Sequence, residues 1–402
     1  MNTVKEVLSK RVHQIDSSPT IALTMKAREL RKQGIDISIF GQGEPDFITP
    51  DHIIESAYRA MKDGYTKYTP VPGILELREA ISAKLMQENG LQYSPEQIVV
   101  SSGAKHSITN MMFAVLDPGD EVIIPVPGWV SYAEQVKLTG AKPVLVKTDN
   151  SNDFKLTAEE LTSAVTPNTK LLILNTPGNP TGSVYTKAEL EDIAEVCLRH
   201  NLLVMADEIY EKLIYDGQVH VSIGSLSQEM LERTVTINGF SKAFAMTGWR
   251  MGYAAAPLEI AKAMNKLQSQ MTSNAASFIQ IASIEALQGP FEPINEMIAE
   301  YDKRRKLMVG YLQDMPGIEC SYPKGAFYVF PGVQGLFGKK YNGIEITDDE
   351  QLTDLLLEYA HILVIPGSSF GMPGSIRLAY ATDETTIIQG MEKLKDFVAK
   401  LV

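Results

Sequence analysis

The sequence predicts an α/β fold, with a large domain whose mostly parallel, seven-stranded sheet is covered by helices, and with a smaller α+β domain. Short apolar runs alternate with segments of helix length between about residues 95 and 256. Several runs are apolar at consecutive positions, which is typical of strands that helices cover on both faces. The seven runs are IVVSS (98–102), EVIIPV (121–126), KPVLVKT (142–148), KLLILNTP (170–177), LLVMADE (202–208), RTVTINGF (233–240) and GYAAAP (252–257).

The segments between these runs carry helical periodicity. In residues 186–201, apolar Leu190, Ile193, Ala194 and Cys197 fall on one face of a helix. After about residue 290 the pattern changes to that of a smaller α+β domain. Its expected elements are a long charged helix (291–313), GAFYVF (325–330), a helix near 348–360, HILVIPG (361–367), SIRLAY (375–380) and a closing helix.

The segment before residue 46 contains one expected helix, LTMKARELRKQG, which is too little to form a core alone. We therefore expect this segment to pack with the C-terminal part. The predicted division is a large domain over residues 47–289 and a small domain formed by residues 1–46 together with 290–402.

Composition excludes several classes of protein. Of the 402 residues, 44% are hydrophobic and 21% charged, which is ordinary for a globular protein and unlike a disordered or disulfide-rich chain. The formal charge of −12 argues against broad contact with nucleic acid or an anionic membrane. No secretory signal and no window of ~18 apolar residues is present, so we expect a cytoplasmic protein. Cys197 and Cys320 are expected to be reduced and buried.

Polar side chains follow three of the predicted strands, at the sheet edge where ligands of open α/β folds collect. Asp207 ends the run LLVMA, and Asn175 ends KLLIL just before the turn TPGNPTG (176–182). Lys242 follows VTINGF, with Arg250 further along the same loop. These residues are expected to share one edge of the sheet.

Two small residues, Gly103 and Ala104, follow a fourth strand and open a helix. Free backbone N–H groups at such a helix start bind anions, and small residues let a phosphate approach. An amine at Lys242, a carboxylate at Asp207 and these phosphate donors are together what a pyridoxal phosphate enzyme requires.

At this point the sequence resembles a known family. The similarity covers almost the whole chain, and its motifs stand in the family's order. They are GEPD (43–46), KYTPVPG (67–73), NPTG (179–182), DEIY (207–210) and NGFSKAFAMTGWRMGY (238–253). The chain looks like the fold type I pyridoxal phosphate-dependent aminotransferases of class I, and in particular like their bacterial aspartate aminotransferase subgroup. One four-residue motif would be weak, whereas the ordered set is highly specific.

For the cofactor, the resemblance implies that Lys242 holds pyridoxal 5'-phosphate covalently and later moves a proton as general base and acid. Asp207 would face the pyridine nitrogen and keep it protonated. Tyr210 and Asn179 would hydrogen-bond the phenolic oxygen. Without the resemblance, Lys242 could be an exposed loop lysine, Asp207 a helix cap and Asn179 an ordinary turn residue.

The resemblance also implies how the ring and phosphate are held. Trp129, in PVPGWVSY, would stack on the ring, although an isolated tryptophan is usually a core residue. Arg250 would pair with the phosphate, together with the backbone at Gly103 and Ala104. Tyr68, on residue pattern a simple loop tyrosine, matches one that a neighbouring subunit donates to the phosphate, which implies a homodimer with shared active sites.

One phosphate ligand departs from the family pattern. Distant members carry a phosphate-binding serine where this chain has Gly239, and Ser241 is the candidate substitute.

For the substrate, the resemblance assigns the α-carboxylate to Arg377, whose planar fork suits bidentate binding, although a solvated strand arginine is the alternative. The backbone of Gly43, otherwise a turn glycine, and the side chains of Trp129 and Asn179 would contact the same substrate. Lys105 opposes the macrodipole of its helix by ~0.3–1 kcal/mol, a local conflict typical of functional sites. It would bind the distal carboxylate of a dicarboxylic substrate. The alternatives are that it supplements phosphate binding or faces solvent.

Together these residues imply an aminotransferase that moves the amino group of L-aspartate to 2-oxoglutarate by a ping-pong route, without a metal. The alternatives are a broad-specificity or aromatic aminotransferase, a carbon–sulfur lyase on the same fold, or a cofactor-sensing regulator domain. The regulator would need a DNA-binding module, for which we expect no room before the cofactor domain. Asp16 stands where some members that transaminate prephenate carry lysine, so we do not expect that activity. His106 is expected to be a helix-surface residue.

Overall fold

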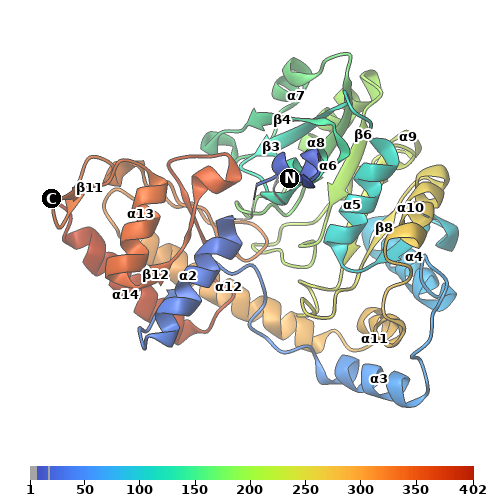
Figure 1. The fold of residues 1–402 in the computed structure, drawn as a ribbon, viewed down its shortest axis with the longest axis horizontal. Coiled ribbons are helices and arrows are strands. Elements are labelled where there is room, and N and C mark those ends of the chain that lie inside the picture. The colour runs from blue at the N-terminus through green and yellow to red at the C-terminus, as the bar shows by residue number, and fades with distance from the viewer. Residues whose placement is uncertain (1–6, 17–18) are drawn as a thin grey trace.

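The computed structural model describes residues 7–16 and 19–402 of the chain. Its centre is a seven-stranded sheet in the order β2-β8-β7-β6-β5-β3-β4 (Figure 1). Strand β8 runs antiparallel to both of its neighbours, and the other pairs are parallel. The strands are β2 (Ile98–Ser101), β3 (Glu121–Val126), β4 (Lys142–Lys147), β5 (Thr169–Asn175), β6 (Leu203–Asp207), β7 (Thr234–Gly239) and β8 (Gly252–Ala255). The predicted mostly parallel, seven-stranded sheet is confirmed.

Helices cover both faces of this sheet, because its central strands are apolar on both sides. Leu171 and Ile173 of β5 pack into one buried cluster with side chains of α5, α6 and α10, whereas Leu172 and Leu174 pack into another with α7 and α8. These helices are α5 (Ala104–Val115), α6 (Ser131–Thr139), α7 (Ala158–Ala164), α8 (Lys187–Arg199) and α10 (Leu258–Met271). The alternation produces the doubly wound arrangement that the apolar runs predict.

Further helices extend the large part of the molecule around the sheet. Helices α3 and α11 lie side by side at its lower edge in Figure 1, with α4 nearby. Their bounds, with that of a short helix before β7, are α3 (Asp51–Lys62), α4 (Leu75–Asn89), α9 (Gln228–Leu231) and α11 (Ser277–Gln288).

The C-terminal part is a smaller α+β unit. The helices are α12 (Glu292–Gln313), α13 (Asp349–Leu355) and α14 (Glu384–Ala399), and the strands are β9 (Tyr328–Val329), β10 (Lys340–Tyr341), β11 (Ile344–Glu345), β12 (Ile362–Leu363), β13 (Ile365–Pro366) and β14 (Ile376–Ala379). Strands β13, β14 and β9 form an antiparallel sheet. The helix predicted near 348–360 differs in detail, because its second half, Leu356–Ala360, is π-helical.

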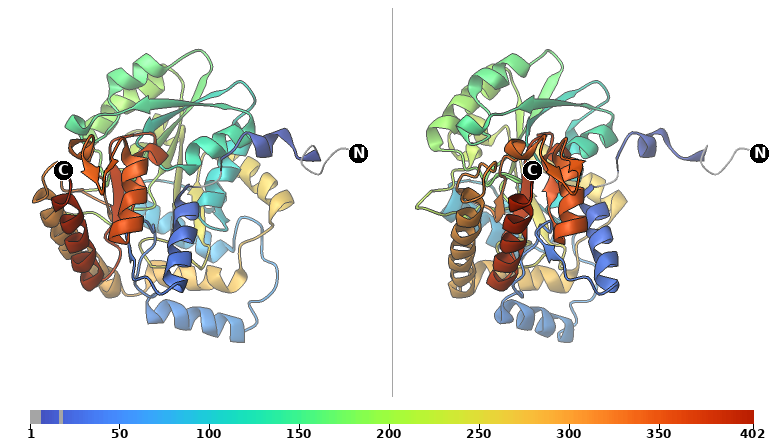
Figure 2. Two further views of the ribbon diagram at one scale, coloured as in Figure 1. Left: turned by 60° about the vertical axis from the view of Figure 1, so that its left-hand side comes forward. Right: turned by 90° about the vertical axis from the view of Figure 1, so that its left-hand side faces the viewer.

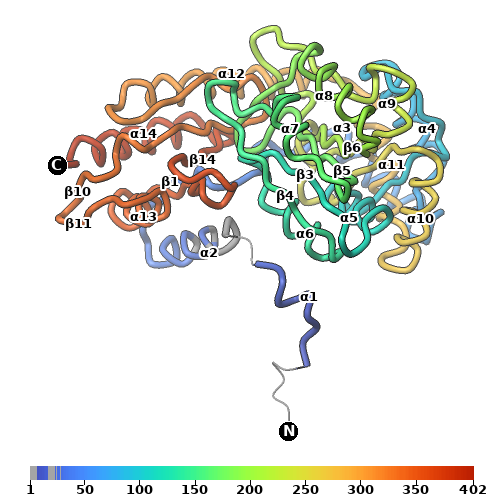
Figure 3. The backbone as a smooth tube through the Cα atoms, turned by 90° about the horizontal axis from the view of Figure 1, so that it is seen from above, coloured from blue at the N-terminus to red at the C-terminus, as the bar shows by residue number. Residues whose placement is uncertain are grey.

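The N-terminal segment packs with this C-terminal unit. Strand β1 (Ser38–Ile39) pairs in parallel with β12, and α2 (Pro19–Lys32) lies beside the orange and red helices in Figure 2. The short α1 (Lys10–His13) stands apart from the body in Figure 3 and has no buried residue. This packing favours the grouping of the N-terminal segment with the C-terminal part. The boundaries at residues 46 and 290 stay a prediction.

Two expectations about single residues need correction. Cys197 is buried in α8, but Cys320 is only half-buried, because it follows α12 in a surface connection. His106 is half-buried rather than on the surface, and its Nδ1 accepts a hydrogen bond from the backbone N–H of Ser102 at 3.3 Å. Within the described residues, no helix combines the length and the apolar character that crossing a membrane requires.

Candidate active site

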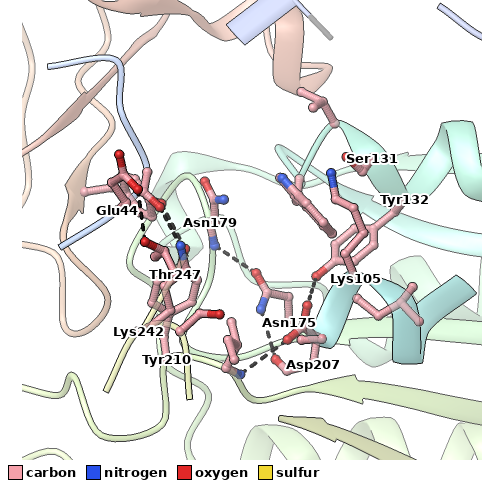
Figure 4. Close-up of a pocket in the computed structure, with 18 of the residues that line it drawn as sticks. Glu44, Lys105, Ser131, Tyr132, Asn175, Asn179, Asp207, Tyr210, Lys242 and Thr247 are labelled. Atoms are coloured by element: carbon pink, nitrogen blue, oxygen red, sulfur yellow. Dashed lines mark hydrogen bonds between the residues drawn. The ribbon is translucent and has the colours of Figure 1, made fainter. Parts of the chain in front are cut away.

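A cavity of about 370 Å³ opens at the carboxyl edge of the large sheet, between the sheet and the C-terminal unit (Figure 4). This edge is where crossover connections of a parallel sheet leave room for ligands. All but two of the predicted site residues line the cavity. The predicted residues that line it are Gly43, Ala104, Lys105, Trp129, Asn179, Asp207, Tyr210, Ser241, Lys242, Arg250 and Arg377.

Lys242 enters the cavity from the loop after β7. Its Nζ donates a hydrogen bond to the backbone oxygen of Gly43 and lies 5.8 Å from the ring centre of Tyr210 and 5.6 Å from that of Phe327. Burial of the ammonium group lowers the pKa of Lys242 to about 8, against the opposing attraction of Glu44. With this pKa about a tenth of the amine is uncharged and nucleophilic at pH 7, and a larger share at higher pH.

Asp207 ends β6, the strand next to β7, so its carboxylate reaches the same cavity as Lys242. It is 4% exposed and accepts hydrogen bonds from the Tyr132 hydroxyl at 2.6 Å and the backbone N–H of Ile209 at 3.3 Å. Burial raises the pKa of Asp207 to about 6, although the bond from Tyr132 acts in the other direction. Both donors are neutral, and among the described residues no cationic side chain bonds this carboxylate, although the charge of Lys242 attracts it from a distance.

Tyr132 was not predicted from the sequence. It lies three residues after Trp129, at the start of α6, and the two rings meet edge to face with centroids 5.2 Å apart. The i, i+3 spacing in PVPGWVSY was the available signal. The bond between Tyr132 and Asp207 also goes beyond a helix-capping role for Asp207, because it comes from a helix on another part of the chain.

The start of α5 forms a second part of the cavity. Gly103 has a positive φ of 89°, and a Cβ there would lie 2.5 Å from Nη2 of Arg250. A Cβ on Gly252 would lie 2.2 Å from the backbone nitrogen of Ala104. Glycine at both positions therefore allows the guanidinium group and the neighbouring strand to approach the helix start, where free N–H groups and a cation together favour an anion.

Lys105 stands at the rim of the cavity. Its Nζ lies 4.7 Å from the ring centre of Trp129. Partial burial and, to a smaller degree, the charge of Arg250 lower the pKa of Lys105. Ser241 is buried and also lines the cavity. Lys105 thus extends from the anion-binding helix start toward the ring of Trp129.

Arg377 forms the opposite wall, on β14 of the C-terminal unit. It is 3% exposed, so it is not a solvated strand arginine. Its Nη1 donates to Asn179 Oδ1 at 3.0 Å and its Nη2 to the Gly41 oxygen at 2.8 Å, while Nε has no partner among the described residues. The aromatic rings of Tyr328 and Phe370 flank the guanidinium group, with centroids 4.5 and 4.9 Å away.

Tyr328 is the second residue that the sequence analysis missed. Its hydroxyl pairs with that of Tyr210 at 2.8 Å, and a Cβ on Gly43 would lie 2.7 Å from the same hydroxyl. Burial and the nearby Tyr328 raise the pKa of Tyr210. Gly43 is therefore required where the N-terminal segment passes over Tyr328 and reaches Lys242.

Two predicted residues do not line the cavity. Gly103 lies directly behind it, against Arg250. Tyr68 is 90% exposed and projects from the surface, so within one chain it does not meet the other site residues. Its predicted role requires a second subunit.

A doubly wound sheet with a half-buried lysine and a buried carboxylate in one cavity defines an α/β enzyme site suited to amine chemistry. Residues 35–394 match the family Aminotransferase class I and II, and the chain belongs to this family of aminotransferases. It is 46% identical to the aspartate aminotransferase of Bacillus subtilis (strain 168), over 98% of this chain and 99% of the relative.

Two further comparisons agree. The aspartate/prephenate aminotransferase of Cereibacter sphaeroides is 45% identical, over 98% of this chain and 99% of the relative. A crystal structure of the aspartate aminotransferase from Rhizobium meliloti superimposes with a TM-score of 0.96 at 42% identity, over 98% of this chain and 99% of that one. The predicted family and fold type are confirmed.

Proposed function

We propose that this chain is a pyridoxal 5'-phosphate-dependent aminotransferase that converts L-aspartate and 2-oxoglutarate to oxaloacetate and L-glutamate. The observation that carries this proposal is the shared cavity of Lys242 and Asp207, which has Arg377 at one wall and Lys105 at its rim. A nucleophilic amine, an uncompensated carboxylate and two cations in one cavity suit a cationic ring and a dicarboxylic substrate.

The residues of the cavity fit the cofactor. No cationic side chain in the described part of the chain bonds Asp207, and a protonated pyridine nitrogen would supply a cation. Arg250 and the backbone at Gly103 and Ala104 would hold the phosphate, with Ser241 beside them. When bound, the cofactor supplies an aldehyde that reacts with amines and a ring that accepts the electrons of a carbanion.

Side chains of the cavity would carry out the proton transfer and hold the ring. Lys242 would hold the cofactor covalently. Once the substrate amine has released it, Lys242 would take the proton from the substrate Cα as general base and then donate that proton as general acid. Its pKa of about 8 suits both directions of this transfer near neutral pH. Trp129 would cover the ring face, while Tyr210 and Asn179 would bind the phenolic oxygen.

The two cations would orient the substrate. Asn179 and Gly41 hold Arg377, whose Nε has no partner in residues 7–16 and 19–402, so the guanidinium group is preorganised for the α-carboxylate. Lys105 would bind the distal carboxylate. Because Arg377 belongs to the C-terminal unit and Lys105 to α5, a substrate that engages both would draw the two parts together and exclude water.

Replacing Lys105 by serine is expected to lower kcat/KM for aspartate by about 10–100-fold, the value of one charge-assisted hydrogen bond. Turnover of phenylalanine should change by no more than about 2-fold, because this substrate has no distal carboxylate. Steady-state kinetics with both amino donors measures the difference. Equal losses for the two donors would reject the role of Lys105 and favour an aromatic or broad-specificity aminotransferase.

Replacing Tyr132 by phenylalanine is expected to move the acid limb of the activity profile to higher pH. The Tyr132 hydroxyl stabilises ionised Asp207 and lowers its pKa, so its removal raises that pKa, and the carboxylate is protonated earlier as pH falls. A shift of about one pH unit corresponds to ~1.4 kcal/mol.

The matched control is Tyr93→Phe, because the buried Tyr93 hydroxyl donates to the Thr234 oxygen at the opposite end of β7. An unmoved acid limb in Tyr132→Phe, or the same shift in both variants, would contradict the assignment. The measurement is kcat/KM between pH 5 and 9.

The proposal includes a homodimer in which Tyr68 completes the partner's phosphate site. Ile48, Tyr58 and Tyr65, which precede Tyr68 in the chain, are exposed as well, and a second copy would have such side chains to cover.

The N-terminal segment bears on whether prephenate is a substrate. Asp16 lies 3.9 Å from Nζ of Lys137 on α6 and does not line the cavity. The proposed substrates therefore do not include prephenate, although the similar Cereibacter sphaeroides enzyme carries it in its name.

A further inference from the structure

The exposed Tyr68 sits on a loop whose backbone is firmly held. The loop, residues 65–74, forms most of the connection between α3, which ends at Lys62, and α4, which begins at Leu75. At its start the Ser277 hydroxyl donates to the Tyr65 oxygen at 2.7 Å, and near its end the Val100 N–H donates to the Pro72 oxygen at 3.0 Å. An aromatic side chain that is 90% exposed is thus carried by a segment that the rest of the chain fixes on both sides.

Gln280 of α11 holds the loop next to Tyr68. It is fully buried, and its Oε1 accepts the Ile74 N–H at 2.8 Å. Its Nε2 donates to Thr69 Oγ1 at 3.0 Å and to the Ala275 oxygen at 2.8 Å. Two of these three side-chain bonds go to the loop and the third goes to Ala275, just before α11, so the amide ties the loop to the start of α11.

Gln268 of α10 joins the same loop to the start of α5. It is fully buried, and its Nε2 donates to the oxygens of Val71 and Val100, each at 2.8 Å. Its Oε1 accepts hydrogen bonds from Ser101 Oγ at 2.6 Å and Asn110 Nδ2 at 3.0 Å. Ser101 stands just before the helix start that lines this chain's own cavity, and Asn110 lies further along the same helix.

Two buried amides with every polar atom satisfied make a fixed geometry, because any displacement of the loop would leave buried groups unpaired. Close packing adds to this constraint, since Gly73 has a φ of 101° and a Cβ there would lie 2.9 Å from a methyl group of Val100. A loop ordered in advance contributes its tyrosine to a partner without a further entropic cost of ordering.

We propose that Gln280 and Gln268 are positioning residues that hold the Tyr68 loop for the active site of a second copy of this chain. Gln280 acts only in trans, on the partner's cofactor site. Gln268 acts in trans through the loop and in cis through Ser101 and Asn110. This inference rests on the proposed function, because it requires a homodimer that binds pyridoxal phosphate.

Hybrid dimers distinguish an effect on the partner's site (in trans) from an effect on the subunit's own site (in cis). Subunits with different affinity tags are co-expressed, and Lys242→Ala inactivates one chosen site in each hybrid. In the first hybrid, one subunit carries Lys242→Ala and the other Gln280→Leu. The competent Lys242 then receives Tyr68 from an intact loop. In the second, one subunit carries both changes and the other is unaltered, so the competent site receives Tyr68 from the altered loop.

The second hybrid is expected to bind pyridoxal phosphate at least about 10-fold more weakly per competent site than the first, whose affinity should equal that of a hybrid with Lys242→Ala alone. Titration of the visible absorption of the bound cofactor gives the affinity, and kcat at saturating cofactor gives a second readout. Gln268→Leu should weaken binding in both arrangements.

Thr69→Val repeats the test with a milder change, because it removes only the hydroxyl that accepts from Gln280. It should show the same pattern with a smaller amplitude even where Gln280→Leu fails to assemble. Equal affinities in the two hybrids, or weaker binding in the first, would overturn the proposal, since a general loss of structure acts in cis. An unaltered protein that stays monomeric or binds no cofactor would overturn the proposed function itself, and this inference with it.

Discussion

Replacing Lys242 by alanine is expected to lower the rate of transamination by about 10⁴-fold or more, because one change removes both the covalent anchor and the general base. The amine is half-buried beside Tyr210, and no other lysine ammonium shares that position among the described residues of the cavity, where Lys105 stands at the rim. Stopped-flow and steady-state assays with aspartate and 2-oxoglutarate measure the loss.

Lys170→Ala is the matched control, because Lys170 pairs with Asp120 away from the cavity. Its activity should stay within about 2-fold of the unaltered protein, as expected for a surface ion pair. If Lys242→Ala retained a tenth of the activity, Lys242 could not be the residue that carries the chemistry.

Replacing Asp207 by asparagine is expected to have two opposite effects. Activity should fall by about 10²–10⁴-fold, because a neutral amide cannot keep the pyridine nitrogen protonated. The cofactor-free protein should become more stable at pH 8, by about 1–3 kcal/mol, because the buried charge is removed while the Tyr132 bond is kept.

The sign of the stability effect follows from the pKa of Asp207, which burial raises from 3.8 to about 6. A carboxylate that binds its proton more tightly in the folded state opposes folding where it is ionised, fully above pH 6 and progressively less as pH falls toward 4. The stability gain from Asp207→Asn should therefore shrink between pH 6 and pH 4. Urea unfolding of the cofactor-free proteins at pH 4.5 and pH 8 measures it, and a variant that is less stable at pH 8 would contradict this account.

Much of the fold could be predicted because it depends on local patterns. Short apolar runs marked all seven strands, and their alternation with segments of helix length indicated parallel pairing. The antiparallel direction of β8 was not predictable, because it depends on the path of the loop that carries Lys242 and Arg250. The π-helical turn at Leu356–Ala360 likewise has no periodic signal of its own.

The candidate site divides in a similar way. Lys242, Asp207 and Arg377 could be singled out because Asp207 ends an apolar run, Lys242 follows one and Arg377 interrupts one, whereas their roles came from the resemblance to the family. Tyr132 and Tyr328 were missed, because a tyrosine at helical spacing or in a strand is normally a core residue. Only the folded chain shows that their hydroxyl groups reach Asp207 and Tyr210.

The roles of the two glutamines behind the Tyr68 loop also could not be predicted from the sequence. Nothing in the sequence around Gln268 or Gln280 distinguishes them from the other glutamines of helices α10 and α11. Their burial and their bonds to a loop that lies about 200 residues away in sequence appear only in the folded chain.

The central claim is that the amine of Lys242 forms a covalent bond with pyridoxal phosphate. Purified protein is incubated with the cofactor, reduced with borohydride, digested, and examined by mass spectrometry. We predict a single stable adduct on the peptide that contains Lys242, with loss of activity in proportion to its yield. An adduct confined to other lysines, or none at all with the activity intact, would contradict the account.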